Sequence, residues 1–128
     1  MKILSPRIHG YLDFVVVALF VLAPSVFGFS GTPAYLSYAL AGIHLTMTLT
    51  TAFPMGLIKL VPFTIHGAIE LLVSLFLAAA PWVFGFADQA PAKIFYVAAG
   101  ILILVVFLLT DYKAADADPA SHAKASAG

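Results

Sequence analysis

Residues 8–29 read IHGYLDFVVVALFVLAPSVFGF, and residues 65–86 read IHGAIELLVSLFLAAAPWVFGF. Ten of the 22 aligned positions are identical, including the opening Ile-His-Gly and the closing Val-Phe-Gly-Phe. With one inserted residue, the match continues from residues 33–43 to residues 91–101. Self-similarity at a fixed offset predicts a repeated structural unit, so the chain is interpreted as one unit written twice.

Both copies are strongly apolar. Of the 128 residues, 62% are hydrophobic and 9% are charged, and the mean hydropathy is +1.06. This composition is far from that of a soluble domain. Apolar stretches occur at four places, each near the roughly 20 residues that a helix needs to cross the hydrocarbon core: 8–29, 35–53, 65–86 and 94–110. We predict an all-α membrane protein with four transmembrane helices in contact with the lipid bilayer.

The repeat divides the chain into two units of two helices each. The predicted parts are a first unit, a cytoplasmic loop, a second unit and a flexible cytoplasmic tail, at 1–53, 54–64, 65–112 and 113–128. Because each unit has an even number of spans, both enter the membrane in the same direction, and a pseudo-two-fold axis along the membrane normal relates them. The tail is small and polar, and its His122 is expected to be solvated.

The basic residues predict an orientation. If four spans alternate, one side of the membrane carries five of the six: Lys2, Arg7, Lys59, Lys113 and Lys124. The positive-inside rule therefore places both termini and the middle loop in the cytoplasm. The first stretch is not interpreted as a signal peptide, because its copy recurs in the middle of the chain.

Composition also excludes several classes of function. The chain has no cysteine, which excludes disulfides, thiolate metal sites and thiol electron relays. Its net charge is zero and it has no basic block, so no nucleic-acid partner is expected. It shows no nucleophile elbow, phosphate loop, HExxH or dinucleotide-binding signature, so no enzyme activity is predicted.

The segments APSVFGF at 23–29 and APWVFGF at 80–86 resemble the SPW-repeat family of small bacterial membrane proteins. That family has a Ser-Pro-Trp motif near the end of the first of two transmembrane helices. The second copy here has Ala80 in place of the serine, and the first has Ser25 in place of the tryptophan. The resemblance implies an integral protein of the bacterial inner membrane built from paired helices, and it implies no particular activity.

This motif has a structural interpretation. A proline in the last turns removes an amide, tryptophan suits the headgroup interface, and a following glycine closes a helix in the left-handed conformation. We therefore expect a structural role for five residues: Pro24, Gly28, Pro81, Trp82 and Gly85.

Two acidic residues, Asp13 and Glu70, fall inside the predicted spans at equivalent positions of the repeat. Each follows a histidine by four residues, His9 or His66, and therefore shares a helix face with it. Ionisable groups within a membrane span are costly to insert and are candidates for function. If the first and third helices face each other, these four side chains converge.

Three explanations remain open at this point. The pairs are structural and serve helix association, as in a non-catalytic membrane subunit that docks a partner or a second copy. Alternatively, two imidazoles and two carboxylates bind a divalent transition metal, or two imidazoles bind a haem. Finally, the pairs handle protons, as in a small proton-coupled carrier. His44 has no counterpart in the second copy, and if a site exists it is the expected asymmetric contributor.

Overall fold

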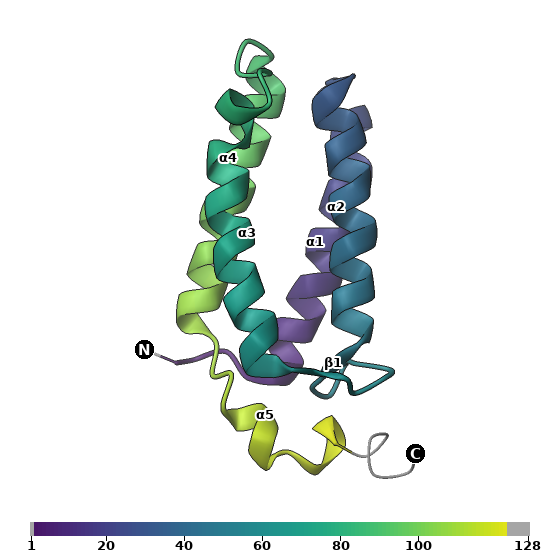
Figure 1. The fold of residues 1–128 in the computed structure, drawn as a ribbon, viewed down its shortest axis with the longest axis vertical. Coiled ribbons are helices and arrows are strands. Elements are labelled where there is room, and N and C mark those ends of the chain that lie inside the picture. Colours follow the sequence, from purple (N-terminus) through teal and green to yellow (C-terminus); the bar gives the residue numbers. More distant parts are fainter. Residues whose placement is uncertain (1, 123–128) are drawn as a thin grey trace.

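The computed structural model of the chain describes residues 2–122. Four long helices lie side by side (Figure 1), with these bounds: α1 Pro6–Phe27, α2 Thr32–Leu49, α3 Phe63–Val83 and α4 Ala90–Leu109. α1 packs mainly against α2, and α3 packs mainly against α4, so the fold consists of two helical hairpins. The segment between α2 and α3 lies at the same end of the bundle as the start of α1, which we call the terminal end (Figure 1). The two short turns lie at the opposite, turn end.

Among the described residues, three helices are long and apolar enough to cross a membrane: α1, α3 and α4. α2 is shorter and carries more polar side chains, including the buried Ser37, His44 and Thr48. The chain is thus a mostly helical protein with three candidate membrane spans and a fourth helix beside them.

The proline and glycine positions explain where the helices begin and end. Ser5 caps α1 by accepting a hydrogen bond from the amide of Ile8, and Pro6 occupies the first turn, where no amide is needed. Gly28 ends α1 with φ 71°, and Gly85 follows α3 with φ 72°. Both have the left-handed conformation expected from the sequence, which costs glycine little.

α2 ends earlier than the stretch predicted to reach residue 53. Its last helical residue is Leu49, whose carbonyl accepts hydrogen bonds from the amides of Leu57 and Ile58. The hydroxyl of Thr51 donates to the carbonyl of Met47. The last carbonyls of α2 thus accept from loop amides and a side-chain hydroxyl instead of from the amides of a further helical turn. The helix therefore ends at residue 49.

Each hairpin is tied to the other at the terminal end. After α2, β1 (Thr51–Ala52) pairs in parallel with β2 (Val61–Pro62), which leads into α3. After α4, Thr110 forms a parallel bridge with Leu4, which leads into α1. Leu4 and Val61 are 57 residues apart, the offset between the two sequence copies. The ends of α2 and α4 are thereby held next to the first turns of α3 and α1.

Residues 114–121, in the segment predicted to be a flexible tail, have regular structure. These residues form a short helix, α5 (Ala114–Ala117), and a 3-10 turn, η1 (Pro119–Ser121). Ala115 and Ser121 are buried, and Ala115 packs with Phe53, Phe63 and Tyr112 at the terminal end. His122 is exposed, as expected, and residues 123–128 lie outside the described residues.

Candidate metal centre

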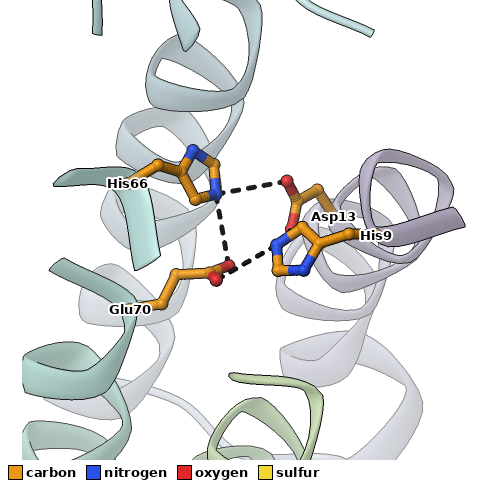
Figure 2. A group of neighbouring side chains, drawn as sticks. All are labelled: His9, Asp13, His66 and Glu70. Atoms are coloured by element: carbon orange, nitrogen blue, oxygen red, sulfur yellow. Dashed lines mark ion pairs between the residues drawn. The ribbon is translucent and has the colours of Figure 1, made fainter. Parts of the chain in front are cut away.

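The four predicted site residues meet at the terminal end of the bundle. His9 and Asp13 project from successive turns of α1, and His66 and Glu70 project toward them from α3 (Figure 2). All four side chains are buried, with at most 3% of any residue exposed. The convergence that the sequence left conditional therefore occurs.

Each carboxylate lies between the two imidazoles. His9 Nε2 is 3.2 Å from Asp13 Oδ1 and 3.1 Å from Glu70 Oε2. His66 Nε2 is 3.3 Å from Asp13 Oδ2 and 3.4 Å from Glu70 Oε1. One ligand atom from each of the four residues lies within 4.8 Å of all the others. The set is compact enough to surround a single ion.

The ring of His66 is oriented by Thr51. The Thr51 hydroxyl lies 2.6 Å from the carbonyl oxygen of Met47 and 2.8 Å from His66 Nδ1. A hydroxyl has one hydrogen, which goes to the carbonyl because that oxygen can only accept. The hydroxyl oxygen must then accept from Nδ1–H of His66. In a neutral ring the lone pair is consequently on Nε2, the nitrogen that faces the carboxylates.

The same arrangement holds His9. The Thr110 hydroxyl lies 2.6 Å from the carbonyl oxygen of Val106 and 2.8 Å from His9 Nδ1. In the part of the chain that the structure describes, neither His9 Nε2 nor His66 Nε2 has a hydrogen-bond partner of acceptable geometry, although both are buried. The lone pairs of the two buried Nε2 atoms therefore face two carboxylates. All four groups can only accept, so a proton or a metal cation must lie between them.

The separations suit a transition-metal ion. A tetrahedral ion with bonds of about 2.0 to 2.1 Å has ligand atoms roughly 3.3 to 3.4 Å apart. The four separations between imidazole nitrogen and carboxylate oxygen are 3.1 to 3.4 Å. Histidine nitrogen and carboxylate oxygen are common zinc ligands, and the same donors bind iron and manganese.

Charge favours a divalent ion as well. The ion pairs observed at Asp13 and Glu70 are with histidines, at 3.1 to 4.0 Å. Burying two ionised carboxylates without positive charge is costly. One divalent cation held by two neutral imidazoles and two carboxylates gives a site with zero net charge.

A model of the SPW repeat domain matches residues 7–110, which is most of the chain. The chain belongs to the SPW repeat family. The comparisons with curated proteins and with solved structures gave no match. The matched region contains both His-Gly motifs and ends at Thr110.

The motif that names the SPW repeat is remote from the site. Pro81 and Trp82 lie near the end of α3, whereas His66 lies in its first turn. Trp82 is exposed, as suits a residue at a membrane interface. Pro24 and Gly28 occupy the equivalent end of α1. The name-giving residues of the repeat thus shape the turn end, and the histidine motifs build the candidate site.

The glycine of each His-Gly pair makes room for neighbouring side chains, Tyr112 at Gly67 and Met55 with Phe53 at Gly10. A Cβ atom on Gly67 would lie 2.6 Å from the ring of Tyr112, and one on Gly10 would collide with Met55 and lie 3.0 Å from the ring of Phe53. Phe53 and Tyr112 thereby cover the site at the terminal end. Any larger residue in place of either glycine would displace this cover.

The carboxylates also have partners that break the symmetry of the repeat. The Tyr112 hydroxyl donates to Glu70 Oε2 at 2.9 Å, and burial, with the Glu70 charge beside it, raises the pKa of this hydroxyl above its usual range. Tyr112 therefore remains a donor. Asp13 accepts instead from the Thr48 hydroxyl at 3.4 Å, and His44 Nε2 lies 3.3 Å from Asp13 Oδ1.

Sequence reasoning overlooked Thr110, Tyr112 and Phe53. A usable pattern was present, because Thr51-Ala52-Phe53 and Thr110-Asp111-Tyr112 repeat the order threonine, any residue, aromatic at an offset of 59. That offset differs from the 57 of the first helices, so an alignment confined to the apolar stretches does not reveal it. His44, by contrast, was expected as the asymmetric contributor, and it lies at the site.

Proposed function

We propose that this SPW repeat protein holds one divalent transition-metal ion between its two hairpins, with His9, Asp13, His66 and Glu70 as ligands. The observation that carries the proposal is the pair of buried Nε2 atoms, each turned toward both carboxylates by a threonine on the far side of its ring. Metal-bound histidines characteristically have their other nitrogen hydrogen-bonded in this way.

We further propose four spans in the bacterial inner membrane, with the site near the cytoplasmic face. The length of α2 beside the three apolar helices supports a fourth span, and three of its polar side chains, Ser37, His44 and Thr48, are buried in the bundle. The paired contacts at Gly10 and Gly67 and at Thr51 and Thr110 support two duplicated hairpins about a pseudo-two-fold axis. The basic residues near the terminal end support the orientation.

The site suits an ion better than a haem. A haem ligated by both histidines would need its macrocycle to pass between the two Nε2 atoms. Oxygens of both Asp13 and Glu70 lie within 3.4 Å of these nitrogens and occupy that space. With four protein ligands the site resembles zinc sites that hold an ion, whereas hydrolytic zinc sites have three protein ligands and keep a position open for water.

The role of each residue follows from this geometry. His9 and His66 supply nitrogen donors whose orientation is set before the ion arrives, which lowers the cost of binding. Asp13 and Glu70 supply the negative charge. Phe53 and Tyr112 exclude water, so that the attraction between the ion and the carboxylates is not screened.

The test is the metal content of the purified protein. Detergent-purified protein is incubated with one equivalent of zinc, desalted and analysed for metal per chain. We expect close to one ion per chain in the wild type and almost none in a His9→Ala, His66→Ala double variant. His122→Ala is the matched control because this histidine is exposed, and it should bind as the wild type does.

Wild-type protein that retains no zinc, iron(II) or manganese(II) under these conditions would overturn the proposal. In that case the four side chains serve helix association, as in a membrane subunit. A proton-coupled carrier would then be tested with an Asp13→Asn, Glu70→Gln variant in proteoliposomes.

A further inference from the structure

A third imidazole reaches the candidate site from a third helix. His44 projects from α2, and its Nε2 lies 3.3 Å from Asp13 Oδ1 and 4.0 Å from Glu70 Oε1. The side chain is buried, with 9% of the residue exposed. His44 therefore contacts both carboxylates that surround the ion, although neither of the other two imidazoles needs it for its own orientation.

The symmetry of the repeat does not require this residue. The position equivalent to His44 in the second copy is Leu102, which is partly exposed and lines an apolar cavity between α1 and α4. The corresponding space between α2 and α3 is lined by His44 instead. The histidine is therefore present in one copy of the repeat only, although the second copy shows that the fold tolerates leucine at this position.

A small cavity adjoins the ring of His44. The cavity has a volume of about 40 Å³ and is otherwise lined by apolar side chains, among them Met47 and Ile69. A space of this size exceeds the roughly 10 to 15 Å³ that one water occupies. The ring of His44 is therefore not packed against other side chains on every side.

We propose that His44 is the fifth ligand of the bound ion, which rests on the function proposed above. The site is then one of three histidines and two carboxylates, drawn from α1, α2 and α3. Such a donor set suits iron(II), manganese(II) or cobalt(II) as well as zinc. In the metal-free protein, His44 contacts Asp13 instead.

Cobalt(II) provides the direct test, because four-coordinate tetrahedral cobalt absorbs visible light several-fold more strongly than five-coordinate cobalt. The wild type and a His44→Leu variant are each loaded with one equivalent of cobalt(II), and bound metal and visible spectrum are measured on the same samples. Leucine is chosen because the second copy has it at this position. We expect weak five-coordinate bands in the wild type and strong tetrahedral bands in His44→Leu, both at one cobalt per chain.

Thr48→Val is the matched control. Thr48 also contacts Asp13, at 3.4 Å, but a hydroxyl facing a carboxylate through its hydrogen does not ligate the ion. If His44 only positions Asp13, then Thr48→Val and His44→Leu should alter the spectrum alike. If His44 is a ligand, Thr48→Val should retain the wild-type spectrum.

A second measurement tests the proposal even if the His44→Leu variant does not fold. X-ray absorption of the zinc-loaded wild type counts imidazole ligands without any substitution, and three are expected. Two imidazoles, or tetrahedral cobalt in the wild type, would overturn the fifth-ligand proposal and leave the four-ligand site standing. Absence of bound metal would overturn the proposed function itself, so the two failures are distinguishable.

Discussion

The hydroxyl of Thr51 lies 2.8 Å from Nδ1 of His66, and this contact decides which nitrogen of the ring faces the carboxylates. Thr51 follows α2, whereas His66 lies in the first turn of α3, so the end of one hairpin orients a ligand on the other. The same relationship joins Thr110, after α4, to His9 on α1. Each hairpin is therefore incomplete as a site without its neighbour.

Removing these threonine contacts should weaken metal binding without removing a ligand. For Thr51→Val or Thr110→Val we expect a loss of zinc affinity of about 10- to 100-fold, the range typical of outer partners of metal-bound histidines. A competition titration against a coloured chelator measures it. Thr50→Val is the control, because the Thr50 hydroxyl also bonds back to α2 carbonyls, those of Thr46 and Met47. An unchanged affinity in both threonine variants would contradict the orienting role.

Substituting the glycine of either His-Gly pair should destabilise the fold. The Cβ of Gly67→Ala would overlap the ring of Tyr112, and overpacking of this kind costs about 1 to 3 kcal/mol in the free energy of unfolding. Gly42→Ala is the matched control, since a Cβ there meets no atom within 4 Å. In a helix this change should be neutral or slightly stabilising. Denaturant unfolding in detergent measures the free energy of unfolding of both variants. Equal values for Gly67→Ala and Gly42→Ala would contradict close packing of Tyr112 against Gly67.

Zinc should stabilise the folded protein. A ligand that binds only the folded state adds about 2.7 kcal/mol at a free concentration of 100 times its Kd. We expect thermal unfolding to shift to higher temperature with zinc and to shift back with a chelator in the wild type. The His9→Ala, His66→Ala variant should show neither shift. Equal responses in the two proteins would mean that zinc acts elsewhere on the chain.

The raised pKa of Tyr112 predicts a loss of stability at alkaline pH. In the unfolded chain this hydroxyl ionises near its ordinary pKa of about 10, whereas burial and the Glu70 charge keep it protonated in the folded protein. Above that pH the unfolded state releases a proton that the folded state retains, so the free energy of unfolding falls as pH rises.

A Tyr112→Phe variant isolates this effect, and Phe53 shows that phenylalanine fits the equivalent position. The free energy of unfolding of the variant should fall less steeply above pH 10 than that of the wild type. Parallel pH profiles in the two proteins would contradict the assignment.

The sequence alone determined much of the architecture. The repeated apolar stretches, closed by Gly28 and Gly85, predicted where α1 and α3 run, because helix ends depend on local backbone preferences. The spacing of four residues placed His9 with Asp13, and His66 with Glu70, on single helix faces, because that relation follows from 3.6 residues per turn. The offset of 57 placed both pairs at matching positions along their helices.

Only the tertiary structure decided that the two faces meet. How a helix is rotated about its own axis depends on the packing of distant segments, which a periodic pattern does not encode. Thr51 and Thr110 illustrate this, since they lie 15 and 101 residues in the chain from the histidines they orient. The first residues after α4 give another example. Residues 114–121 look polar and small in isolation, but Ala115 is buried in a cluster with Phe53, Phe63 and Tyr112 at the terminal end.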